Sequence, residues 1–341
     1  GRGTHTHQCP SHDKMLALRA AARALGVTGA GGRGLSGLAG AASIYREHPR
    51  SHYQFALDDI TIEVGSHYAR PDEPTPTLRY APDVDNTIPG ILHVTPFSVS
   101  QYCFFGEKGN LGRKSKFTKS FDNIISDPAE ASHEITLVPH GLGDADTNVE
   151  LLDYLQWLGD IRSKLVDHLT ENLDAYPSLA KKYGFLAGKG DDETLREMID
   201  QLCTNPVRYA KDEAGDVDTE QPTLPFRQKL FFRASGAALA RAQSVAASMG
   251  EIDAEMLGRN YARKHVPLYN RDGHEVPLAN AALFGGDIVS IENRLLCQLY
   301  DVGGNVGAGL KRNMASVVQI DQRRQGDAPP PPQSPFQDIE L

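Results

Sequence analysis

Residues 285–320 decide the fold, and they read GGDIVSIENRLLCQLYDVGGNVGAGLKRNMASVVQI. In both halves apolar residues alternate with polar ones, as they do along strands that bury one face. The segment between the halves, Asp301 to Asn305, contains two glycines and an asparagine and therefore supplies turn residues. We predict a long antiparallel hairpin with a buried face made of Val289, Ile291, Leu295, Cys297, Leu299, Val306, Ala308, Leu310, Met314, Val318 and Ile320.

Upstream of the hairpin, the pattern predicts a second strand and a long helix. Residues 225–234 alternate, which places Phe226, Gln228, Leu230 and Phe232 on one face and Arg227, Lys229, Phe231 and Arg233 on the other. Over residues 147–173 apolar residues recur at steps of three and four, as in one long amphipathic helix. Thr147 and Glu150 have the spacing of a capping box at its start. Shorter helices are expected at about 178–186 and 192–203, from the same kind of spacing.

The chain ends differ in composition from the centre. Residues 1–50 contain no acidic residue from Lys14 to Arg46 and are rich in Gly, Ala and Ser, which predicts a disordered leader. The basic stretch after Met15 has the composition of an organelle transit peptide, so we expect the mitochondrial matrix, with a plastid or a viral protein in an infected cell as alternatives. Residues 71–89 contain five prolines, and residues 51–89 are interpreted as an extension and a Pro-rich linker. Residues 90–320 form the folded domain, and residues 321–341, with four consecutive prolines, form a disordered tail.

The amino-acid composition excludes several classes of protein. With 40% hydrophobic and 23% charged residues, the chain is neither wholly disordered nor fibrous. No apolar run approaches the about 20 residues of a membrane helix. The 44 acidic and 35 basic residues exclude a uniformly basic coat, although a basic groove on an acidic body remains possible. The four cysteines are far apart, which suits a reducing compartment and gives no zinc signature.

No motif points to an enzyme, a cofactor or a resident metal. The catalytic patterns G-x-S-x-G and H-E-x-x-H are absent from the sequence. Gly106 to Ser115 superficially matches a phosphate loop, but the glycine spacing is one residue too long and Arg113 stands where lysine is required. The N-terminal His5, His7, Cys9 and His12 can bind metals, yet no second cluster has the spacing to complete a site. We interpret them as an incidental His-rich end.

The sequence has clearer signs of nucleic-acid binding than of catalysis. The sequence has four basic clusters, most of them with aromatic neighbours, and single-stranded nucleic acid needs this combination for phosphate contacts and base stacking. Each cluster could instead be an ordinary solvated surface. The prediction of a binding site therefore requires the clusters to lie together in the fold. The candidate residues are Arg113, Lys114, Lys116, Phe117 and Lys119 (with Tyr102, Phe104 and Phe105 just upstream), then Arg227, Lys229, Phe231 and Arg233, then Arg263, Lys264 and Tyr269, and finally Lys311 and Arg312.

Several runs of the sequence carry a family resemblance. The runs Lys264–Pro277, Gly285–Val289, Leu299–Tyr300 and Val306–Ile320, with the strand His133–Pro139 before the long helix, resemble the single-stranded DNA-binding proteins of T7-like phages. That resemblance covers about residues 90–341. It implies mixed β with α, namely an OB-fold-like barrel with an inserted helix. It also implies sequence-independent binding of single-stranded DNA in replication, recombination or repair, without a cofactor.

The resemblance also gives the tail a role. In that family an acidic tail with an aromatic residue binds partners, and here Phe336, Asp338 and Glu340 stand in its place. A replicative polymerase or helicase is the partner class that this implies, and a homodimer stays open. This tail is less acidic than the family's, and residues 1–89 have no counterpart in it. Two alternatives remain: a viral structural or assembly protein, and a nucleic-acid-processing enzyme.

Overall fold

The computed structural model describes residues 50–51, 55–67, 70–83, 88–114, 124–138, 145–186, 192–211, 217–244, 250–302 and 304–321. Every described residue belongs to one compact unit of the chain. The predicted leader and tail lie outside the described residues, apart from Arg50 and Asp321. None of the described helices is both long and apolar enough to span a membrane.

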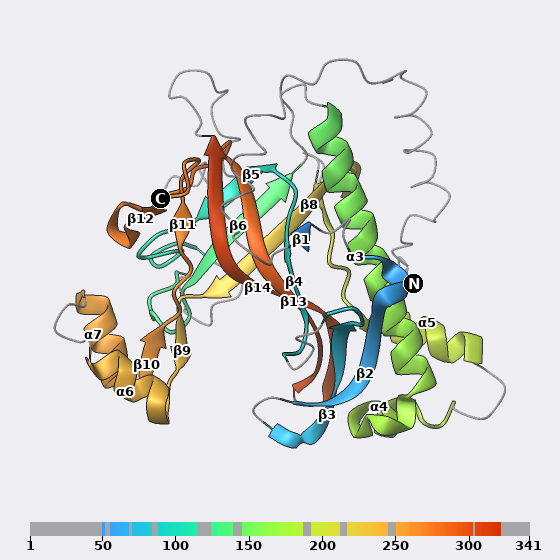
Figure 1. Ribbon diagram of the computed structural model, residues 1–341. Coiled ribbons are helices and arrows are strands. Elements are labelled where there is room, and N and C mark those ends of the chain that lie inside the picture. The colour runs from blue at the N-terminus through green and yellow to red at the C-terminus, as the bar shows by residue number, and fades with distance from the viewer. Residues whose placement is uncertain are drawn as a thin grey trace, which may run out of the picture. The chain divides into compact units, whose positions relative to one another are not determined.

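The predicted hairpin is confirmed and is the longest strand pair of the fold. β13 (Ile288–Val302) and β14 (Asn305–Asp321) pair antiparallel from Ile288 opposite Asp321 to Val302 opposite Asn305. Gly304 in the turn has a φ of 85°, a left-handed conformation that glycine adopts without strain. Val289, Ile291 and Leu295 are fully buried in the main core. The hairpin therefore supplies the two strands around which the other elements are arranged (Figure 1).

The main sheet has the strand order β12-β11-β14-β13-β5-β6-β8-β7, with β4 also paired to β13 and β1 to β4. A single parallel bridge joins Cys203, just ahead of β7, to Ala308 in β14, so the two sides of this path meet. The result is the OB-fold-like barrel of mixed β and α structure that the sequence predicts. The bounds of the remaining strands are β1 Arg50–Ser51, β4 Ile91–Val94, β5 Ser98–Phe104, β6 Ser132–Val138, β7 Arg208–Lys211, β8 Val217–Lys229, β11 Leu268–Tyr269 and β12 Glu275–Val276.

The long inserted helix is confirmed as α3 (Ala145–Glu171), and it packs along the main core. Its start differs from the prediction: the helix begins two residues before Thr147, so Thr147 lies inside the first turn and the capping-box assignment is wrong. At the start of its apolar face, Leu151 is buried in the core, whereas the neighbouring Leu152 is 39% exposed. The shorter helical elements that follow are η3 (Leu173–Ala175), α4 (Pro177–Tyr183) and α5 (Asp192–Leu202).

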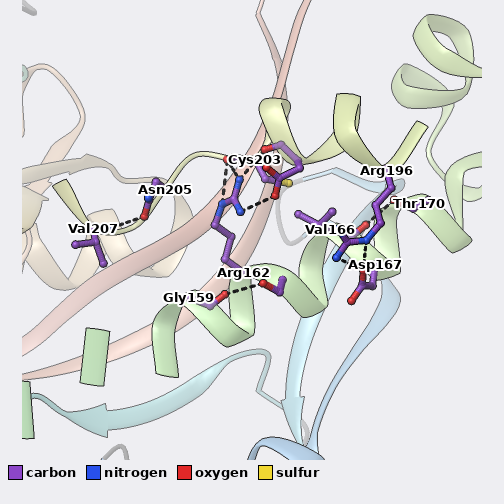
Figure 2. Close-up of polar contacts among 11 residues, drawn as sticks. Gly159, Arg162, Val166, Asp167, Thr170, Arg196, Cys203, Asn205 and Val207 are labelled. Carbon is purple, nitrogen blue, oxygen red and sulfur yellow. Dashed lines mark hydrogen bonds and ion pairs between the residues drawn. The ribbon is translucent and has the colours of Figure 1, made fainter. Parts of the chain in front are cut away.

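Arg162 on α3 fixes the end of α5 (Figure 2). Its Nη1 donates to Asp200 Oδ1 at 2.7 Å and its Nη2 to the Asp200 carbonyl at 2.6 Å. Nε and Nη2 also donate to the Cys203 carbonyl, at 3.2 and 2.9 Å. The last carbonyls of a helix have no intrahelical partner, and here a half-buried guanidinium supplies one. Because Cys203 also bridges Ala308, the inserted helix helps to hold the barrel closed.

The predicted proline-rich linker is wrong. Residues that we assigned to it form β3 (Arg70–Tyr80), which pairs antiparallel with β2 (Ile60–His67), the strand that follows the short helix η2 (Leu57–Asp59). Leu78 and Tyr80 of β3 are buried in the main core with Phe55 and Ile60, so the folded domain begins before residue 90. Proline is compatible with such a strand because a two-stranded ribbon has free edges that need no N–H donors.

The elements between β8 and β11 form a smaller lobe next to the end of β8 (Figure 1). β9 (Phe231–Arg233) pairs antiparallel with β10 (Tyr261–Arg263). Helices α6 (Gly236–Ser244) and α7 (Glu251–Gly258) pack with this pair, while η5 (Leu278–Asn280) precedes β13. Leu230 and Phe231 share a small core with Ile125, Ala131 and Met256. This lobe therefore has its own packing, separate from the barrel core.

Candidate nucleic-acid interface

Strands β5, β6 and β8 present one outward face of the barrel. Phe104 lies opposite Glu134, and Glu134 lies opposite Arg227 on the next strand. Their sequence neighbours Ile135 and Phe226 are buried in the main core, because side chains alternate across a strand. The outward residues therefore form a row across three strands. We call Tyr102, Phe104, Arg113, Glu134, Arg227 and Lys229 the β5–β6–β8 face.

Two aromatic rings lie at the β5 side of this face. Tyr102 is 54% exposed, and its ring packs edge-on against Phe104 with the centroids 4.8 Å apart. A bulge in the pairing between Ser100 and Tyr102 shifts the register at this point. Such a bulge re-aims the side chains that follow it. The exposed ring of Tyr102 is a flat surface on which a base can stack.

Arg113 joins this aromatic pair from the loop that follows β5. Its guanidinium carbon lies 5.6 Å from the centroid of the Phe104 ring, within cation–π distance. Burial raises the pKa of the Tyr102 hydroxyl, as does Glu134, whereas Arg113 lowers it, so both charged groups lie close enough to act on this hydroxyl. Lys114 follows and is exposed. Arg113, from the cluster predicted around residues 113–119, thus lies on the same face as the β8 cations.

The β8 side of the face carries Arg227 and Lys229. Arg227 Nε lies 3.1 Å from Glu134 Oε1 and 3.3 Å from Ser132 Oγ. Lys229 Nζ donates to the Glu130 carbonyl at 2.7 Å. Partial burial lowers the pKa of Lys229, and the neighbouring Arg227 lowers it further. Both side chains keep a large exposed surface, which leaves them accessible to the phosphates of a bound strand.

Glu134 is the acidic group at the centre of the face. Asn110 Nδ2 donates to Glu134 Oε1 at 2.9 Å, and Asn110 Oδ1 accepts from the Ser132 N–H at 2.7 Å. Burial raises the pKa of Glu134, while Arg227 and the Asn110 bond lower it. Asn110 therefore links the loop after β5 to β6 and holds the carboxylate beside Arg227.

The predicted role of Phe231 is corrected by the structure. β8 ends at Lys229, Leu230 interrupts the strand, and β9 pairs with β10 instead of β6. The alternation therefore breaks, and Phe231 is 3% exposed, whereas Phe232 is 44% exposed. The Arg263 guanidinium lies 4.7 Å from the centroid of the Phe231 ring. Phe231 is a core residue of the small lobe, so it cannot be the stacking surface next to Arg227 and Lys229.

Two arginines that the sequence predicts as phosphate ligands make contacts within the protein instead. Arg263 Nε pairs with Asp253 at 2.7 Å, and its Nη1 donates to the Glu107 carbonyl at 2.9 Å. Arg312 points inward, with its guanidinium 5.1 Å from the centroid of the Phe226 ring, and burial lowers its pKa to about 10. Both arginines hold the fold together, so assigning them to the DNA surface is wrong.

The other predicted residues are more dispersed. Arg233 is exposed on β9, opposite Tyr261. Tyr269 lies in β11 between Glu275 and Val318. Lys311 is exposed on β14. The pKa of the half-buried Lys264 is lowered mainly by burial and further by the charge of Lys311. Six residues lie outside the described part of the chain, namely Lys116, Phe117, Lys119, Phe336, Asp338 and Glu340.

Sequence reasoning did not include Tyr102, Phe104, Asn110 and Glu134 among the site residues. Tyr102 and Phe104 were noted only as aromatic neighbours of the Arg113 cluster. Residues 98–104 alternate weakly, and the bulge at Gln101 changes which residues face outward. Within the described residues, no group of three or more His, Cys, Asp or Glu side chains is arranged to hold a metal ion.

No family model and no curated protein matches the sequence. Among solved structures, the chain is similar to gp2.5, a single-stranded DNA-binding protein of bacteriophage T7, with 12% identity, a TM-score of 0.38 and coverage of 70% of this chain and 97% of that one. It is also similar to the single-stranded DNA-binding protein of bacteriophage Enc34 with its C-terminus truncated (14% identity, TM-score 0.31, coverage 68% and 86%). The same Enc34 protein in complex with single-stranded DNA gives 12% identity, a TM-score of 0.29 and coverage of 68% and 86%.

Proposed function

We propose that this protein binds single-stranded DNA on the β5–β6–β8 face. The observation that carries the proposal is the convergence of an aromatic pair, the exposed Tyr102 and the half-buried Phe104, with the cations Arg113, Arg227 and Lys229. These residues come from two strands, β5 and β8, and from the loop that follows β5, and the two strands are far apart in the sequence. Phosphates attract the cations, and unpaired bases stack on the rings.

The geometry suits a strand whose bases are already unstacked. In a duplex the flat faces of the bases are covered by their neighbours, so the aromatic pair has nothing to stack on. Stacking tolerates every base, and phosphate contacts carry no sequence information. A binding mode of this kind serves proteins that cover exposed strands during DNA replication, recombination or repair. It needs no bond-breaking step, and we assign the protein no catalytic role.

The experiment that tests the proposal compares three ligands of one sequence: single-stranded DNA, duplex DNA and single-stranded RNA. Fluorescence anisotropy at several salt concentrations should give tightest binding to single-stranded DNA, with an affinity that falls as salt rises. Equal affinity for the duplex would contradict a stacking interface. The absence of salt-dependent binding to all three ligands would contradict the function altogether.

The tail belongs to the same proposal. Residues 327–341 combine Asp327, Asp338 and Glu340 with the aromatic Phe336, so they can compete for the basic face and dock on a replicative polymerase or helicase once displaced. Deleting residues 327–341 should tighten binding to single-stranded DNA, most of all at low salt, where screening is weakest. Unchanged affinity at low salt would rule out the competition.

A further inference from the structure

Glu134 is the feature of the β5–β6–β8 face that phosphate binding does not explain. A carboxylate at the centre of a cationic surface repels phosphates and therefore weakens non-specific binding. The fold nevertheless holds Glu134 in place, through Asn110 Nδ2 at 2.9 Å and Arg227 Nε at 3.1 Å. Its position calls for a role in which an acceptor is useful.

The two oxygens of Glu134 are not equivalent. Both contacts, from Asn110 and from Arg227, are made to Oε1. Oε2 accepts no hydrogen bond from the described residues. It is also absent from the side-chain atoms that are both buried and without a partner, so Oε2 is not enclosed by the protein. An ionised carboxylate is an acceptor only. The free oxygen is therefore available to a donor from a ligand, while the other oxygen fixes the orientation of the side chain.

Glu134 is also within reach of a base on the aromatic pair. It lies directly opposite Phe104, and Tyr102 lies opposite Thr136, two residues further along β6. Directly opposite side chains are about 5 Å apart at Cβ, and diagonal neighbours about 7–8 Å. These spacings are short enough for a base stacked on the exposed ring of Tyr102 to reach the free oxygen of Glu134 with one of its edges.

We propose that Glu134 gives this face a base preference, by accepting a hydrogen bond from the exocyclic amino group of cytosine and disfavouring thymine. The inference rests on the proposed function, since it concerns a base stacked on the same face. Cytosine carries the N4 amino donor where thymine carries the O4 acceptor. The first forms a charge-assisted hydrogen bond with the carboxylate, and the second places two acceptors against each other.

The test uses oligo(dC) and oligo(dT) of about 15 nucleotides, which covers the site size of one OB fold. The dissociation constant is measured for each oligomer with the wild type, with Glu134→Gln, and with Glu193→Gln as a matched change of an exposed glutamate on α5. Glutamine has the shape of glutamate, and its amide can donate to O4 as well as accept from N4. The readout is the ratio of the dT to the dC dissociation constant, which cancels the common effect of removing one negative charge.

We expect this ratio to be about fivefold higher for the wild type than for Glu134→Gln, since one charge-assisted contact gives discrimination at the low end of the range for base readout. Glu193→Gln should keep the wild-type ratio. If Glu134→Gln binds both oligomers more tightly by the same factor, Glu134 only repels phosphates and the inference is wrong. An unchanged ratio with unchanged affinities also overturns it. If the wild type binds neither oligomer, the proposed function fails, and the inference fails with it.

Discussion

The guanidinium of Arg113 lies over the ring of Phe104, and this contact joins a loop residue to the aromatic pair on β5. The relationship brings a cation from one part of the sequence to the face that carries Arg227 and Lys229. Sequence spacing alone placed these residues in separate clusters. The shared face is what makes them one candidate interface.

Replacing Arg113 with alanine should lower the salt dependence of DNA binding. If Arg113 neutralises one phosphate, the slope of log K against log salt should fall by about 0.7 for a single strand. The measurement is a salt titration of affinity by fluorescence anisotropy. Arg196→Ala is the matched control, because Arg196 is an exposed arginine on α5 that pairs with Asp167. An identical slope for Arg113→Ala and the wild type would remove Arg113 from the interface.

Phe231→Ala should destabilise the protein instead of acting on a stacked base. Removing a buried phenylalanine costs about 3–5 kcal/mol of unfolding free energy, through lost burial and the cavity that is left. The neighbouring Phe232→Ala is the control, since Phe232 is largely exposed and its loss should cost much less. Urea denaturation of the two variants gives the comparison. Similar unfolding free energies for both would show that the break in alternation at Leu230 is misplaced.

His133 predicts a pH dependence of stability. Burial lowers its pKa to about 4, with Arg263 adding to the effect, and its ring stacks on Phe105. Between about pH 6.5, where the unfolded residue titrates, and about pH 4, the unfolded chain binds a proton that the folded chain does not. The contribution of His133 is therefore favourable above about pH 6.5 and is lost as the pH falls towards 4.

The measurement for His133 is the unfolding free energy at pH 7 and pH 5, for the wild type and for His133→Gln. From pH 7 to pH 5 the wild type should lose about 2 kcal/mol more than the variant. The difference between the two proteins isolates His133 from the other titrating groups. An equal loss in both would mean that His133 titrates normally in the folded protein.

The leader gives a prediction that can be tested separately from the fold. Residues 15–50 are basic and free of acidic residues until Glu47, so we expect them to direct a fused fluorescent protein to mitochondria in a eukaryotic cell. A fusion in which Arg19 and Arg23 are replaced by glutamate is the control, and it should stay in the cytosol. A diffuse signal from the unaltered leader would favour a viral or bacterial source.

The sequence predicted those parts of the fold that have strong periodicity. The β13–β14 hairpin and α3 were predicted because alternation and heptad-like spacing extend over fifteen residues or more. The prolines of β3 concealed a strand, since a two-stranded ribbon tolerates residues that a central strand excludes. The interface was predicted in part: the cations of β8 are on the expected face, but their aromatic partners are on β5. Which strands pair, and where a single residue such as Leu230 shifts the phase, depends on tertiary contacts that spacing does not encode.

Tyr102→Ala tests the central claim most directly, because Tyr102 is the exposed ring of the β5–β6–β8 face. Its hydroxyl makes no hydrogen bond to another described residue, so its loss should leave the fold intact. Its control is Phe185→Ala, which removes an aromatic ring of similar exposure, 59%, beside α4. The affinity for single-stranded DNA is measured at fixed salt, with thermal unfolding to show that both variants are folded. The account predicts that Tyr102→Ala loses about 1–3 kcal/mol of binding free energy, the contribution of one stacked base, while Phe185→Ala binds as the wild type does. A folded Tyr102→Ala variant with wild-type affinity would contradict it.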